Sequence, residues 1–161
     1  MELNLDAPRP TPEKRPRDSA TLINEMVRLI DRLAEHPIFK QANLGLTEWC
    51  FLRTVAESEG LGGGRVAGRL GITPQRSAQI ANALVAAKYV NSTPSADDGR
   101  RKILTITEHG RTTVAGIDRQ IAELFQQTFP DVTKAVAGTS RNVRKLLQAI
   151  SQSEKGKKSP D

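Results

Sequence analysis

The chain has 161 residues, a formal net charge of +6 and a sequence pI near 9.8. With 37% hydrophobic and 26% charged residues, it has the size of one ordinary domain and enough apolar residues for a core. A membrane span is excluded, because no run approaches about 18 consecutive apolar residues. The N-terminus lacks the apolar core of a secretory signal and the single cysteine cannot form an intrachain disulfide, so we expect a cytoplasmic protein. The positive charge favours a polyanionic partner, either nucleic acid or a membrane surface.

The N-terminal region is expected to divide near residue 18. Residues 1–18 contain four prolines and no hydrophobic periodicity, which predicts a disordered arm. Apolar side chains then recur at helical spacing and predict a helix that begins near Asp18 or Ser19 and ends before Pro37. We assign residues 19–45 to this helix and a linker.

The central segment, residues 46–107, combines short helices with strong stop signals. A helix is expected to begin at about Thr47, which would be its N-cap. The glycine-rich stretch 60–64 breaks the helical pattern. A short helix follows it and is predicted to stop at Gly71, since glycine is the usual residue just after a helix.

A longer helix and a hairpin come next. Thr73-Pro74 is predicted to open a helix that runs towards Val90, because Thr is a good N-cap and Pro suits the first helical position. Two extended runs, Tyr89–Thr93 and Lys102–Ile106, are joined by a loop that contains the hairpin signal Asp98-Gly99. The order of helix, tight turn, helix and hairpin predicts a winged helix-turn-helix. The fold class is therefore mainly α with a small β-hairpin wing.

Two amphipathic helices are predicted over residues 108–153, followed by a flexible tail over 154–161. Pro130 ends the first of these helices and Asp131 can cap the second. The apolar stripes of these helices and of the N-terminal helix exceed what a small winged core can cover, and such a face usually meets a partner. We therefore expect a homodimer; the alternative is a thick helical layer in a monomer.

Charge and helical phase indicate one surface as the binding surface. Residues 64–111 contain eight basic and three acidic residues, a net charge of +5, so most of the excess charge lies on the winged helix-turn-helix. On its second helix Gln75, Gln79 and Asn82 face away from the buried side, and Gln and Asn can pair bidentately with adenine edges. Arg76 lies on the flank of that face, nearer to a phosphate or a guanine edge.

The predicted hairpin tip adds a second basic feature. Arg100, Arg101 and Lys102 follow the tip, where a narrow and electronegative minor groove would attract them. Asp98 could brace Arg100, although a solvated loop with an ordinary turn acid is the alternative interpretation. Beside the outward-facing side chains of the second helix, these charges favour double-stranded DNA as the partner. A membrane surface is not expected as a partner, because no basic amphipathic helix carries the charge.

In its helix-turn-helix and wing residues, the sequence resembles the MarR family of multiple-antibiotic-resistance regulators. The resemblance rests on Val66-Ala67, on Leu70-Gly71, on the predicted helix 73–90 and above all on DDGRRKILTITEHGR. In that last stretch an Asp-x-Arg wing is followed, at the family's spacing, by Ile106-Thr107 and Gly110.

The resemblance implies that Thr73, Gln75, Arg76 and Gln79 face the major groove and that Arg100 enters the minor groove with Asp98 holding it. It also implies a repressor that acts as a homodimer on a near-palindromic operator, with dimerisation helices within 19–45 and 108–153. A small, anionic, aromatic effector becomes a candidate partner by the same resemblance. No cofactor is implied.

The sequence does not favour a cofactor site, a redox site or a metal site. The glycines at 62–64 match a dinucleotide-binding pattern, but the βαβ unit that such a site needs is not predicted around them. Cys50 lies in an apolar run that favours packing over redox activity, and His36 and His109 have no metal-type spacing. No catalytic constellation emerges. Two other functions stay open, a winged-helix module that binds an acidic protein and an architectural protein that binds DNA without sequence preference.

Overall fold

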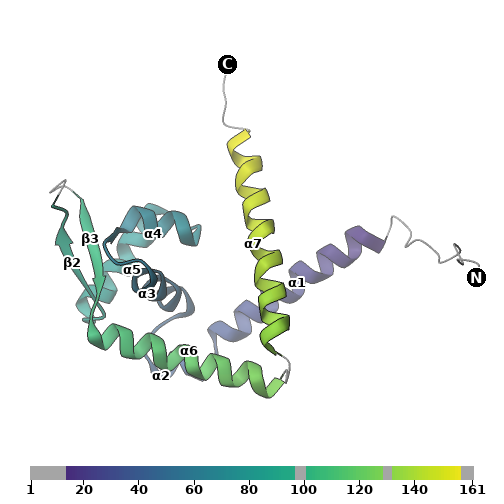
Figure 1. The fold of residues 1–161 in the computed structure, drawn as a ribbon, viewed down its shortest axis with the longest axis horizontal. Helices are drawn as coiled ribbons and strands as arrows, with labels where there is room; N and C mark the ends of the chain where they lie inside the picture. The colour runs from purple at the N-terminus through teal and green to yellow at the C-terminus, as the bar shows by residue number, and fades with distance from the viewer. Residues whose placement is uncertain (1–13, 97–100, 129–131, 157–161) are drawn as a thin grey trace, which may run out of the picture. The chain divides into compact units, whose positions relative to one another are not determined.

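Figure 1 shows the computed structural model, which describes residues 14–96, 101–128 and 132–156. Over these residues the protein is mainly helical with a small antiparallel sheet, which confirms the predicted fold class. The elements in chain order are α1 (Lys14–Ala34), α2 (Pro37–Gln41), α3 (Leu46–Glu57), β1 (Leu61–Gly62), α4 (Gly63–Leu70), α5 (Pro74–Ala86), β2 (Val90–Pro94), β3 (Lys102–Ile106), α6 (Glu108–Thr128) and α7 (Val132–Gly156). Among the described helices, none is long and apolar enough to cross a membrane.

The described residues form two compact units, one that ends at Ile117 and one that begins at Asp118, and α6 belongs partly to each. The first unit contains the hydrophobic core, in which α3, α4, α5 and the sheet pack against one another. The largest side chains that are fully buried include Phe39, Phe51, Leu52, Ile80, Leu84 and Ile117. Side chains from α2 and α6 are therefore buried along with those of the winged segment 46–107.

The sheet has three strands in the order β1-β3-β2, all antiparallel. Strands β2 and β3 pair from Val90↔Ile106 to Pro94↔Lys102, which confirms the predicted hairpin, and they lie side by side in Figure 1. On its other edge β3 pairs with β1 through Leu61↔Leu104. The sequence predicts only a break over 60–64. A strand of only two residues, Leu61 and Gly62, shows no alternating pattern in the sequence. Strand β1 therefore forms because β3 offers it a partner.

Both ends of the described chain are more helical than predicted. Helix α1 begins at Lys14 rather than near residue 18, so the last residues of the predicted arm are helical. Pro16 is tolerated there because the N–H groups of the first turn have no acceptor within the helix, so the N–H that proline lacks is not missed. Helix α7 continues to Gly156, since the polar residues before it contain no helix breaker, and the predicted tail is shorter at its start. The predictions for residues 1–13, for Pro130 and Asp131 and for 157–161 lie outside the described residues.

The segment between α1 and α3 differs from the predicted linker because it contains the short helix α2. His36 is the N-cap of α2, where its Nδ1 atom accepts a hydrogen bond from the N–H of Ile38 at 3.3 Å. The N-cap of α3 is Gly45 and not Thr47, which lies inside the first turn. Helix α3 therefore starts slightly earlier than predicted.

Candidate DNA interface

The helix-turn-helix of α4 and α5 is shaped by a glycine turn at one end of α4 and by a hydrogen bond between the two helices at the other. At its C-terminal end Gly71 has a left-handed backbone (φ 66°), a conformation that favours glycine, and the Ile72 N–H donates to the Ala67 carbonyl at 3.1 Å. At its N-terminal end the buried Ser77 hydroxyl of α5 donates to the Gly63 carbonyl at 2.7 Å. These contacts fix the helix-turn-helix that the sequence predicts.

The two ends of α5 are set by local chemistry. Thr73 is the N-cap, as predicted, and its Oγ1 atom accepts a hydrogen bond from the Arg76 N–H at 3.1 Å. Pro74 occupies the first helical position. The helix ends at Ala86 and does not reach the predicted end near Val90, because the chain turns at Lys88, whose backbone is left-handed (φ 61°).

The faces of α5 follow the predicted helical phase. Ser77, Ile80 and Leu84 are buried against the core. The exposed side chains include Gln75, Arg76, Gln79 and Asn82, together with the N-cap Thr73. The helix therefore offers a polar face that could enter a groove while its other face stays packed. The contacts of these exposed side chains with DNA remain a prediction.

The wing extends beyond the last pair of β2 and β3, because the Ser95 N–H donates to the Arg101 carbonyl at 2.8 Å. Arg101 and Lys102 are both exposed at this far end of the hairpin. Asp98 and Arg100 lie outside the described residues, so their predicted contact with each other and with the minor groove remains a prediction.

The base of the wing shows what the Thr-x-x-Gly part of the motif does. The Thr107 N–H donates to the Tyr89 carbonyl at 3.0 Å, and the Thr107 hydroxyl lies 2.8 Å from the Lys88 carbonyl oxygen. The same hydroxyl oxygen accepts from the Gly110 N–H at 3.0 Å. A Cβ atom at Gly110 would collide with the Tyr89 carbonyl. The motif thus ties the start of α6 to the turn between α5 and β2.

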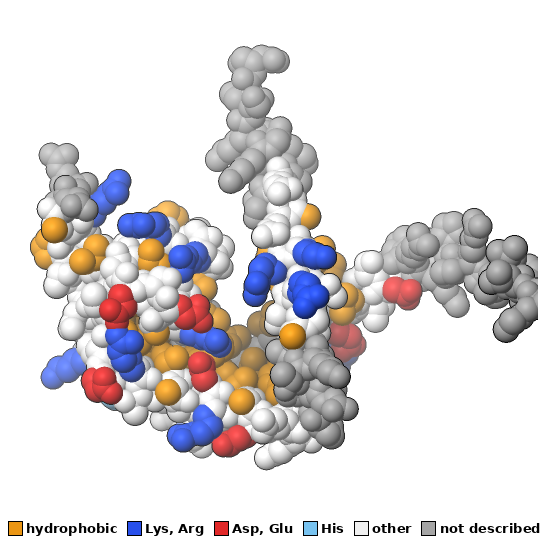
Figure 2. Space-filling view, in the orientation of Figure 1, with side chains coloured by type: hydrophobic (Ala, Val, Ile, Leu, Met, Phe, Trp, Pro, Cys, Tyr) orange, Lys and Arg blue, Asp and Glu red, His pale blue; other side chains and the backbone are white. Residues whose placement is uncertain are grey.

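Two features of this surface are absent from the predicted site. Arg65 and Arg69 are exposed on α4, and Figure 2 shows Lys and Arg side chains over α4 and beside the wing. Their charge is visible in the sequence, but only the helix packing places α4 beside the α5 face. In addition, Arg76 forms an ion pair with Glu48 of α3, with Nη2 and Oε1 3.3 Å apart. Since 28 residues separate the two, no sequence spacing signals this pair.

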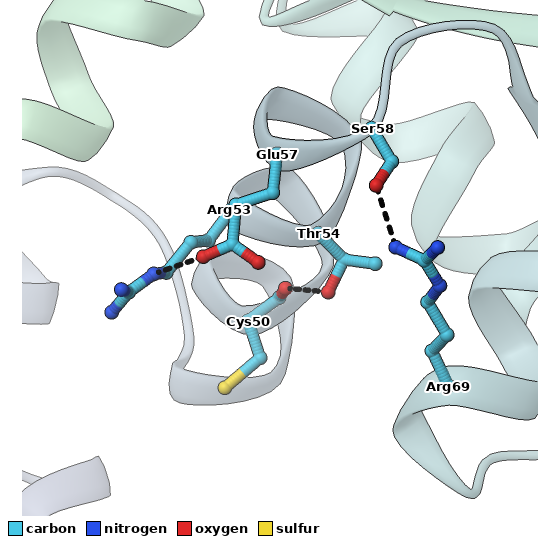
Figure 3. Close-up of polar contacts among 6 residues, drawn as sticks. All are labelled: Cys50, Arg53, Thr54, Glu57, Ser58 and Arg69. Carbon is cyan, nitrogen blue, oxygen red and sulfur yellow. Dashed lines mark hydrogen bonds and ion pairs between the residues drawn. The ribbon is translucent and has the colours of Figure 1, made fainter. Parts of the chain in front are cut away.

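Cys50 is half-buried on α3 (Figure 3). Burial raises the pKa of its thiol above the ordinary value, and the nearby Arg53 guanidinium opposes this only in part. Arg53 also donates to Glu57 at 3.1 Å on the same helix, while Arg69 of α4 donates to Ser58 at 2.6 Å. A raised pKa leaves less of the reactive thiolate, which supports packing as the role of Cys50.

The glycine-rich stretch contains β1, which pairs antiparallel with β3, so β1 is not a strand of a parallel βαβ unit. His36 caps α2, and His109 stacks on Tyr89 with ring centroids 4.7 Å apart. Over the described ranges no group of three or more His, Cys, Asp or Glu could hold a metal ion.

These features define a winged helix-turn-helix with an exposed polar helix and a basic hairpin. No model of a protein family matches the chain, and no curated protein matches it. Several solved structures are similar to it. The transcriptional regulator SlyA has a TM-score of 0.72 and 17% identity, and the match covers 88% of this chain and 99% of SlyA. Staphylococcus aureus MarR in complex with salicylate and kanamycin has a TM-score of 0.71 and 19% identity, covering 85% of this chain and 95% of that one.

A third similar structure is a mutant of S. aureus MepR bound to an oligodeoxyribonucleotide, with a TM-score of 0.57 and 18% identity. The match covers 82% of this chain and 97% of MepR. The chain therefore has the fold of the MarR-family transcription regulators, which confirms the fold that the resemblance in DDGRRKILTITEHGR predicts.

Proposed function

We propose that this protein is a sequence-specific, double-stranded DNA-binding transcription regulator, a repressor that acts as a homodimer, and not an enzyme. One observation carries the proposal. Gln75, Arg76, Gln79 and Asn82 lie on the exposed face of a helix whose opposite face is buried, and a basic hairpin belongs to the same unit. An α-helix fits the major groove of B-DNA, and amides and guanidinium groups can read base edges there. The similar MepR structure contains an oligodeoxyribonucleotide, which supports this choice of partner.

The homodimer is supported by exposed apolar side chains on the outer helices. Exposed side chains on α1 include Leu22, Ile23, Val27 and Ile30, and those on α7 include Leu146, Leu147 and Ile150. Each helix by itself presents an apolar surface of the kind that marks protein interfaces. A second copy would bury these surfaces and present two α5 helices to successive major grooves, about 34 Å apart.

The test is salt-dependent binding of the full chain to a duplex selected from a random pool and to a scrambled duplex. We expect affinity to fall steeply with salt on both, because Lys and Arg release counterions from phosphates, while the selected duplex stays preferred at physiological salt. Equal affinity for every duplex would instead favour an architectural protein. No duplex binding at all would favour a module for an acidic protein.

Two substitutions test the assigned contacts. Arg100→Ala should weaken DNA binding by about 1–3 kcal/mol without unfolding the chain, and unchanged affinity would remove the wing from the interface. Gln79→Ala should relax sequence preference more than it weakens nonspecific binding. A uniform loss over all sequences would make Gln79 a phosphate contact instead.

Two further parts of the proposal need separate measurements. Sedimentation should show a dimer at micromolar concentration, and a monomer would contradict the role given to α1 and α7.

A small aromatic anion is the proposed effector class, supported by the salicylate in the similar S. aureus MarR structure. Titration of the DNA complex with salicylate should then release DNA, whereas benzyl alcohol, a neutral aromatic control, should not.

A further inference from the structure

We propose that Glu48 is a specificity-determining residue of the DNA-binding surface, which acts through Arg76. It holds the guanidinium in place for a base edge and limits its attraction to phosphates at random sequences. This inference rests on the proposed function, since it concerns how the same surface discriminates between duplexes. Glu48 itself is a positioning residue, because the contact with DNA belongs to Arg76.

The ion pair joins the first turns of two different helices. Arg76 lies in the first turn of α5, three residues after the N-cap Thr73, and Glu48 lies in the first turn of α3. Their side chains are 52% and 26% exposed, so the arginine reaches towards solvent while the carboxylate is more enclosed. The pair therefore anchors an exposed side chain of the reading helix to a neighbouring element.

Glu48 is held in its position by features of α3. A carboxylate in the first turn interacts favourably with the partial positive charge of the helix N-terminus. The carboxylate also lies close over the N-cap Gly45, since a Cβ atom added there would collide with it. Glycine at position 45 thus leaves the space that the acid occupies when it reaches Arg76.

The consequence for DNA binding follows from charge. An unpaired arginine gains from any phosphate, because each phosphate contact releases a counterion whatever the sequence. An arginine already paired with a carboxylate gains less, since the contact exchanges one anion for another. Its remaining N–H groups can still donate to guanine O6 and N7, a contact that depends on the base. Glu48 thus lowers nonspecific affinity more than specific affinity.

The test compares Glu48→Gln with a matched control, Glu57→Gln, in the full chain. Glu57 lies on the same helix and pairs with Arg53 at 3.1 Å, so both changes remove one negative charge and one ion pair to an arginine. An exposed pair of this kind affects an equilibrium about two- to fivefold. We expect E48Q to raise affinity for the scrambled duplex by that factor and to steepen its salt dependence by up to about one in log–log slope. The preference for the selected duplex should fall correspondingly, and E57Q should leave it unchanged.

Two further variants separate the contact from bulk charge. In an Arg76→Gln background, E48Q should change binding no more than E57Q does, because the group through which Glu48 acts is gone. Gly45→Ala should lower selectivity in the same direction as E48Q while the net charge stays constant, and thermal melts will show that each variant is folded.

The inference is overturned if E48Q and E57Q have equal effects on selectivity, or if the effect of E48Q persists without Arg76. Wild-type selectivity in E48Q would overturn it as well. These outcomes differ from failure of the proposed function, in which the wild-type protein itself binds no duplex or shows no preferred sequence.

Discussion

Gly110→Ala tests whether the start of α6 is tied to the chain before the wing as closely as the structure indicates. A Cβ atom there would collide with the Tyr89 carbonyl and come within 2.8 Å of Ile106 Cγ1. The first obstacle is backbone, held by the Thr107 N–H at 3.0 Å, so it cannot rotate away as a side-chain end would. We expect the substitution to push α6 away from the turn between α5 and β2.

The magnitude follows from two opposed effects. Forcing an extra methyl group into a packed site costs about 1–3 kcal/mol, and collision with backbone places this case towards the upper end. Replacing glycine by alanine in a helix returns at most about 1 kcal/mol. The free energy of unfolding should therefore fall by about 1–2 kcal/mol, which lowers the melting temperature by roughly 2–8 °C for a chain of this size.

The assay is chemical and thermal unfolding at one fixed protein concentration, because association would make the midpoint depend on concentration. The control is Gly68→Ala on α4, where an added Cβ atom meets nothing within 4 Å. That change should raise the free energy of unfolding by about 0.5–1 kcal/mol through helix propensity alone. If Gly110→Ala proved as stabilising as Gly68→Ala, the close approach to Tyr89 would not exist and the account of the motif would be wrong.

Three other substitutions or modifications have defined outcomes. Thr73→Ala should lower the free energy of unfolding by about 1 kcal/mol, since it removes the acceptor for the Arg76 N–H, and Thr73→Ser should restore most of it. Ser77→Ala should cost a similar amount, about 1 kcal/mol, by removing the hydrogen bond to Gly63, and unchanged stability would exclude a structural role for that bond. Cys50 should react slowly with iodoacetamide at neutral pH and faster as the pH rises, since burial raises the pKa of its thiol and only the thiolate reacts. Alkylation as fast as that of an unfolded control would contradict this.

The sequence predicts the helix-turn-helix well because its signals are local. Thr73 and Pro74 mark the start of α5 by their own chemistry, and Gly71 marks the turn by the left-handed backbone it adopts. The hairpin is equally local, because β2 and β3 are consecutive along the chain and pair from Val90↔Ile106 to Pro94↔Lys102. Helical phase alone then assigns Gln75 and Gln79 to the exposed face.

The parts that sequence analysis misses depend on partners that are distant in the chain. Strand β1 has two residues and forms only because Leu104 of β3 pairs with Leu61. Helix α2 has five residues, too few for a period to show, and is stabilised by the His36 cap and by burial of Ile38 and Phe39. Neither element carries a pattern of its own, so only the folded core specifies them.

The Glu48–Arg76 pair is the same case at the level of the binding surface. The sequence alone leaves both a phosphate and a guanine edge open as the contact of Arg76, because helical phase gives the direction of a side chain but not its neighbours. The fold supplies the neighbour: α3 and α5 pack together, and their first turns bring a carboxylate to 3.3 Å from the guanidinium. A phosphate would have to compete with that carboxylate, whereas a guanine edge can use the donors that the carboxylate leaves free. The contact between two helices, and not the reading helix alone, therefore favours the base edge as the role of Arg76.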